Sequence, residues 1–156
     1  MGRLGLALLS ALLIGSCGPA RGDLRPGRGW REVELDDHLA YRSDQGAVTI
    51  SVSGLHVNSD GIVKVHIWVF PREIETVSVE AADIVLIDAD GRACPNDAGA
   101  RKEFATRSRH EPFMGVFEVE DIPRLRRDGC TLRISVVPYA PSEGTPILVE
   151  VRYFPF

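Results

Sequence analysis

Apolar and polar residues alternate along most of the chain, and clusters of turn residues interrupt the alternation. A period of two places every second side chain on the same face of an extended strand. Between these segments, Asn58–Gly61 and Asp88–Gly91 contain Asn, Asp and Gly, which tolerate the backbone of tight turns. Seven or eight short strands without an amphipathic helix predict an all-β domain, a single antiparallel β-sandwich. The alternating or short apolar segments are 48–57, 63–69, 77–79, 84–87, 116–119, 130–136 and 147–153.

The N-terminus has a different pattern. Arg3 is followed by the uncharged, mostly apolar run Leu4–Ile14. Its length fits the apolar region of a secretory signal, about 7–15 residues, and is well short of the ~20 needed to cross a bilayer. We therefore expect residues 1–16 to be a signal peptide that is removed and takes no part in the fold.

The end of this segment, Ile14-Gly15-Ser16-Cys17, resembles the lipobox of bacterial lipoproteins. The resemblance implies cleavage before Cys17, a diacylglycerol on its sulfur and acylation of the new amine. Several acyl chains together anchor a protein stably. Gly18 after the cysteine, rather than Asp, implies the periplasmic face of the outer membrane in a double-membraned cell. The alternative is an ordinary secretory signal, an incidental Cys17 and a soluble periplasmic or secreted protein.

Residues 18–29 contain almost no apolar side chains and are rich in Gly and Pro. Such a segment buries too little surface to fold by itself. We expect residues 17–29 to form a lipidated, disordered tether that spans at most about 40 Å. The β-sandwich domain is then expected over residues 30–156.

Composition limits the range of partners. The chain has 22 acidic and 18 basic residues and a net charge of −4. A nucleic-acid binder normally carries a basic face, so nucleic acid is not an expected partner.

Two further cysteines, Cys94 and Cys130, lie in the expected domain. An even pair in an exported domain favours a disulfide, which would contribute about 3–4 kcal/mol. Neither has a Cys or His at metal-ligand spacing, so a metal pair is the less favoured alternative. We predict a Cys94–Cys130 disulfide.

The run Ile84-Val-Leu-Ile-Asp-Ala-Asp-Gly-Arg92 is similar to a segment of the Ig-like domains found in many bacterial lipoproteins. In those domains a strand ends in Asp-x-Asp-Gly and a polar loop follows. The resemblance implies that the sandwich is Ig-like, with about seven to eight strands.

Acidic residues in this region offer two candidate sites. Asp88, Asp90 and Asp97 fit three positions of a calcium-binding loop, but Leu86 occupies its first position and cannot bind the ion. A hairpin turn is the favoured interpretation. We interpret the pair Glu118 and Glu120 as solvent-exposed charges.

No nucleophile motif is present in the sequence, so we predict no catalytic residues and a protein that is not an enzyme.

The histidines are scattered at 38, 56, 66 and 110. His56 and His66 flank one predicted hairpin and approach each other if its strands pair. Neither has a third ligand nearby in the sequence, so solvent-facing side chains are favoured and no metal or cofactor is expected.

His66, Trp68 and Phe70 lie on the strand face opposite Val63, Val65, Ile67 and Val69. Two explanations stay open: a central strand buried on both faces, or an exposed aromatic strip that binds a partner. We take these three residues as the candidate partner surface. The predicted function is a non-enzymatic, membrane-anchored envelope lipoprotein that binds or scaffolds an envelope protein or carbohydrate. The alternative is a small secreted enzyme or metal-binding protein that uses the scattered His, Asp and Glu residues.

Overall fold

The computed structural model describes residues 22–96, 102–105, 111–138 and 144–156, and every structural statement below concerns these ranges. The predicted signal peptide, Cys17, Asp97 and His110 lie outside them. The elements in chain order are β1 (Leu24–Pro26), β2 (Arg31–Leu35), β3 (His38–Gln45), β4 (Val48–Ser53), β5 (His56–Val57), β6 (Ile62–Pro71), β7 (Thr76–Val79), the 3-10 helix η1 (Ala81–Asp83), β8 (Ile84–Ile87), β9 (Ala93–Pro95), β10 (Lys102–Ala105), β11 (Phe113–Glu118), α1 (Ile122–Asp128), β12 (Cys130–Pro138) and β13 (Ile147–Pro155).

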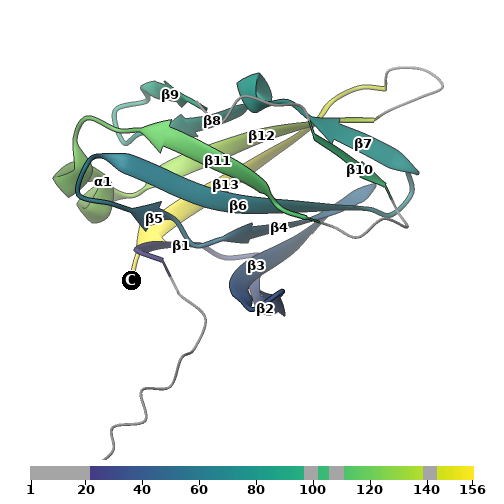
Figure 1. Ribbon diagram of the computed structural model, residues 1–156, viewed down its shortest axis with the longest axis horizontal. Coiled ribbons are helices and arrows are strands. Elements are labelled where there is room, and N and C mark those ends of the chain that lie inside the picture. The colour runs from purple at the N-terminus through teal and green to yellow at the C-terminus, as the bar shows by residue number, and fades with distance from the viewer. Residues whose placement is uncertain (1–21, 97–101, 106–110, 139–143) are drawn as a thin grey trace, which may run out of the picture.

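The described strands form two antiparallel sheets that pack against each other (Figure 1). One sheet has seven strands, in the order β1-β13-β12-β7-β10, with β8 on β12 and β9 on β8. The other has six, in the order β11-β6-β4-β3-β2, with β5 on β6. The predicted all-β sandwich is confirmed, although the chain divides into more strands than the seven or eight expected.

The core lies between the sheets and explains the period-two pattern. On β12, the buried side chains of Leu132, Ile134 and Val136 alternate with more exposed ones. On β6, Val63, Val65, Ile67 and Val69 are all fully buried. These strands therefore place one apolar face into a shared core, which is the main source of stability for such a fold.

Strand β1 lies inside the segment predicted to be a disordered tether, so that prediction is wrong for residues 22–29. Leu24 is fully buried and pairs with Pro155 of β13, and the Gly27 amide donates a 3.0 Å hydrogen bond to the Arg152 carbonyl. A short edge strand needs backbone partners, and β1 finds them in β13 and in Leu55, which exchanges hydrogen bonds with Leu24. The ordered domain therefore begins before residue 30.

Helix α1 was not predicted, because seven residues are too few for a visible helical period. Its boundaries nevertheless follow helix-end chemistry. The Asp121 side chain accepts a hydrogen bond from the Arg124 amide at 3.0 Å, Pro123 lies in the first turn, and Gly129 ends the helix with φ of 76°. None of the helices in the described ranges is both long enough and apolar enough to cross a membrane.

Candidate binding cleft

Cys94 and Cys130 are both free thiols, so the predicted disulfide is wrong. Strand β8 lies between the strands that carry them: Leu86 pairs with Cys94 on one side and with Leu132 on the other. Two strand spacings amount to about 9.6 Å, beyond the roughly 7 Å between Cα atoms that a disulfide spans. Burial raises the pKa of the Cys130 thiol to about 12, with smaller contributions from Cys94 and Asp88. The pKa of Cys94 is also raised, by burial and then by Asp88 and Glu120.

Trp68 is only 1% exposed, so His66, Trp68 and Phe70 do not form the exposed aromatic strip that was considered. Trp68 is buried on the sheet face that points away from the core. It pairs with Ser51 of β4. The His38 and His66 rings lie 6.0 and 5.9 Å from its own ring, centroid to centroid.

Phe70 is covered in a similar way. The Arg42 guanidinium of β3 lies 4.8 Å from the Phe70 ring centroid, and its Nε donates to the Ser51 hydroxyl at 3.0 Å. Side chains of the same sheet therefore shield this face, a tertiary effect that strand periodicity does not report.

Histidines gather on this face. The rings of His38 and His66 lie 5.0 Å apart, centroid to centroid. Strand β4 ends at Ser53, and beyond that point the short strand β5 takes its place beside β6. His56 pairs with Lys64, two residues before His66. Burial lowers the pKa of His66, and repulsion from His38 and His56 lowers it further. Within the described residues, no group of three or more His, Cys, Asp or Glu side chains is arranged to hold a metal ion.

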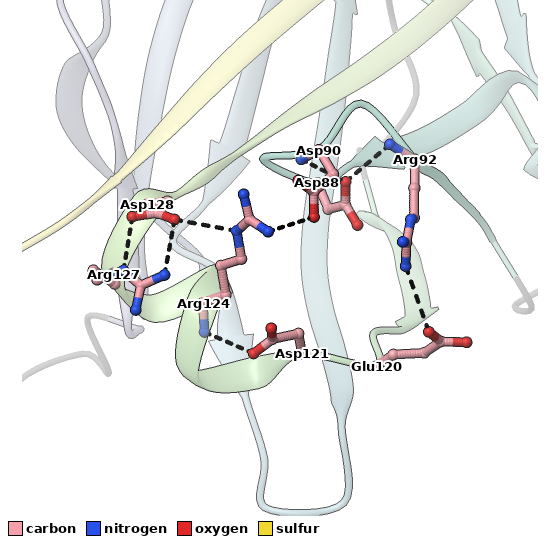
Figure 2. Close-up of polar contacts among 8 residues, drawn as sticks. All are labelled: Asp88, Asp90, Arg92, Glu120, Asp121, Arg124, Arg127 and Asp128. Carbon is pink, nitrogen blue, oxygen red and sulfur yellow. Dashed lines mark hydrogen bonds and ion pairs between the residues drawn. The ribbon is translucent and has the colours of Figure 1, made fainter.

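The Asp88–Gly91 turn forms a corner of the sandwich next to α1 (Figure 2). The Asp88 carboxylate accepts hydrogen bonds of 2.9 Å from the amides of Asp90 and Arg92, which confirms the hairpin-turn interpretation. Arg124 pairs with Asp90 at 2.7 Å, and Arg92 pairs with Glu120 at 3.8 Å. Arg124 thus balances the charge of Asp90, one of the carboxylates that the sequence offered as a calcium loop, while Asp88 accepts hydrogen bonds from the turn itself.

A cleft of about 680 Å³ lies between the edge strand β1 of one sheet and β2 and β3 of the other. We call it the edge cleft. Three aromatic rings, two arginines and one acidic side chain give it both apolar and charged walls. Its lining residues are Arg25, Pro26, Gly27, Arg28, Trp30, Glu32, Tyr41, Phe154 and Pro155.

Phe154 shapes one wall of the edge cleft and is 40% exposed. Arg25 is its cross-strand partner, and the Arg152 guanidinium lies 5.2 Å from its ring centroid. The ring packs closely over Gly27, where an added Cβ would come within 2.5 Å of its Cε2 atom. Arg25 in turn lies 5.1 Å from the centroid of Phe156. These cation–π contacts hold guanidinium groups beside exposed rings.

Sequence reasoning missed the edge cleft because its walls come from residues 25–41 and from the last residues of the chain. Residues 25–29 fall in the predicted tether, and no periodic signal links this part of the chain to the last residues. The exposed arginines near Trp30 and the terminal aromatic residues were the available signals. No protein-family model matches this chain, and no significantly similar curated protein or solved structure was found.

Proposed function

We propose that this chain is an exported, non-enzymatic lipoprotein of the cell envelope, anchored through lipid on Cys17. Its Ig-like β-sandwich binds a partner at the edge cleft. The signal-like run Leu4–Ile14 and the lipobox-like Ile14–Cys17 support export and anchoring. The edge cleft carries the binding function, because exposed aromatic rings beside arginines are typical of recognition surfaces.

The chemistry of the edge cleft favours binding over catalysis. Its lining residues offer aromatic faces, guanidinium groups and the single carboxylate of Glu32. A catalytic nucleophile requires an adjacent general base, and the cleft-lining residues include no Ser, Thr, Cys, Lys or His. Phe154 and the arginines can instead contact a partner that is both apolar and anionic.

The anchoring is tested by expression of the full chain in a bacterial host and partitioning into detergent. The wild type should enter the detergent phase and incorporate a clickable fatty acid. Cys17→Ser should do neither, while Cys94→Ser should behave as the wild type. Equal partitioning and equal labelling of the wild type and Cys17→Ser would overturn the anchoring.

The 5.0 Å separation of the His38 and His66 rings favours a second candidate, metal binding. This separation is short enough for both imidazoles to bind one metal ion. Met114 is the cross-strand partner of His66, and its thioether would suit Cu(I). Equilibrium dialysis with Cu(I) and Zn²⁺ tests this candidate. The metal-binding candidate requires that the wild type binds one ion per chain and that His38→Gln and His66→Gln bind none. Unchanged binding in both variants would exclude this candidate.

A further inference from the structure

We propose that the partner of the edge cleft is an anionic phospholipid bilayer, the membrane that holds the lipid anchor. The contacting surface consists of Arg25, Arg28, Arg152, Phe154 and Phe156, which we call the anchor-proximal surface. This inference rests on the proposed function, since it names the partner of the same cleft. Exposed aromatic rings and arginines lie together at β1, the first described strand of the domain, and the inference rests on this arrangement.

The anchor-proximal surface exposes apolar rings to solvent. Phe154, on the outward-facing side of the end of β13, is 40% exposed, and Phe156, directly after the strand, is 58% exposed. Exposed aromatic side chains enter the boundary between lipid headgroups and acyl chains readily, because their apolar body is buried there at little cost. Strand β13 runs beside β1, the first described strand (Figure 1), where Phe154 is the cross-strand partner of Arg25 and the Phe156 ring lies against the Arg25 guanidinium.

The charges of this surface suit anionic headgroups. Arg25 and Arg152 lie against the rings of Phe156 and Phe154, so each exposed ring has a guanidinium group beside it. Arg28 adds a third exposed cation at the rim of the cleft. The carboxylate of nearby Asp23 is engaged by the Val57 amide at 2.7 Å. Each arginine at an anionic surface increases partitioning about fivefold, which offsets the repulsion from a chain of net charge −4.

The position of the anchor brings this surface to the bilayer. Since β1 begins at Leu24, only six residues separate it from Cys17, and the seven steps from Cys17 to Leu24 span at most about 25 Å. The tether predicted from composition would have reached about 40 Å. A short tether raises the effective concentration of the surface at the headgroups, so weak intrinsic binding is sufficient.

The test uses the chain from Gly18 onward, which carries no lipid. The buried core extends from Leu24 to Tyr153, so this chain retains the whole core. Flotation should show binding to vesicles of equal parts phosphatidylglycerol and phosphatidylcholine, and little binding to phosphatidylcholine alone. In a Trp68→Phe background Trp30 is the remaining tryptophan, and its emission should shift to the blue with the anionic vesicles.

The double variant Phe154→Ser/Phe156→Ser should lower the partition coefficient at least tenfold. Leu148→Ser is the matched control: Leu148 is 68% exposed on the same strand but at its other end, and its replacement should leave binding unchanged. Arg25→Gln should weaken binding about fivefold at low salt.

Three results would overturn the proposal. The first is an absence of binding to anionic vesicles. The second is an equal loss of binding in Leu148→Ser and in the phenylalanine variant. The third is a cleft that binds free inorganic phosphate while vesicles leave Trp30 emission unchanged. None of these results bears on the lipid anchor, which the Cys17→Ser comparison tests separately.

Discussion

The hydroxyl of Tyr153 donates a 2.8 Å hydrogen bond to the backbone carbonyl of Ser53, 100 residues earlier in the chain. Tyr153 belongs to β13 of one sheet and Ser53 to β4 of the other, so the bond crosses the sandwich. Burial raises the pKa of Tyr153 well above its usual value, which keeps the hydroxyl protonated and able to donate. Its position also joins the end of the chain to the sheet that carries the edge-cleft strands β2 and β3.

Tyr153→Phe keeps the ring and removes only the donor. We expect a loss of about 1–3 kcal/mol in the free energy of unfolding, because a buried carbonyl is left without this partner. Tyr153→Leu should cost more, since it also removes ring volume from the core. Urea unfolding followed by circular dichroism measures both. A Phe variant as stable as the wild type would show that the bond adds no net stability.

Trp68 should behave as a buried residue. Trp68→Ala is expected to cost about 3–5 kcal/mol, enough to unfold a marginal domain. Trp68→Phe should cost much less, because the buried Nε1 atom has no hydrogen-bond partner among the described residues. Iodide should quench Trp30 emission and spare Trp68. Strong quenching of Trp68, or a Trp68→Ala variant of full stability, would contradict its burial.

Gly129 and Gly91 allow the cost of adding a side chain at a positive φ to be compared with and without a steric collision. Both have positive φ, 76° and 79°, but an added Cβ at Gly129 would collide with the Tyr153 carbonyl oxygen, whereas the space around Gly91 is open. Gly91→Ala should therefore cost roughly 1 kcal/mol and Gly129→Ala about 2–4 kcal/mol. Thermal unfolding of the two variants gives the comparison. Equal melting temperatures would mean that the collision is relieved by local movement.

The two thiols should differ in reactivity. Cys130 is buried with a pKa raised to about 12, so it should resist alkylation until the protein unfolds. Cys94 is partly exposed and should react slowly, because its pKa is also raised. Mass spectrometry of the native protein after timed alkylation measures both rates, with unfolded protein as the control. A mass lower by two hydrogens, with no reactive thiol after unfolding, would contradict the free-thiol state.

His66 should make stability depend on pH. Its pKa in the folded protein lies below the ordinary 6.5, so the unfolded chain binds the proton more readily in the range between the two values. Stability is therefore fully present above about pH 6.5 and falls as the pH drops through the lowered pKa. His66→Gln should flatten this slope, and His56→Gln should flatten it less. Urea unfolding at several pH values between 7.5 and 5 checks the slopes; identical slopes in all three proteins would contradict this role.

The fold class could be read from the sequence because a sandwich core imposes its period on each strand separately. Alternation alone predicts the burial of four residues of β6, Val63, Val65, Ile67 and Val69. The Asp88–Gly91 turn is equally local, because Asp88 makes its hydrogen bonds within the turn itself. Such features need no knowledge of distant residues.

Other features were decided only by tertiary structure. Leu24 becomes part of a strand because β13, from the far end of the chain, offers it a free edge. The free state of Cys94 and Cys130 depends on β8 running between their strands, which spacing along the chain does not reveal. Burial of Trp68 depends on side chains of neighbouring strands, and the walls of the edge cleft come from strands of both sheets. Periodicity reports which face of a strand is apolar, whereas partners, edges and clefts depend on how the strands are ordered in the two sheets.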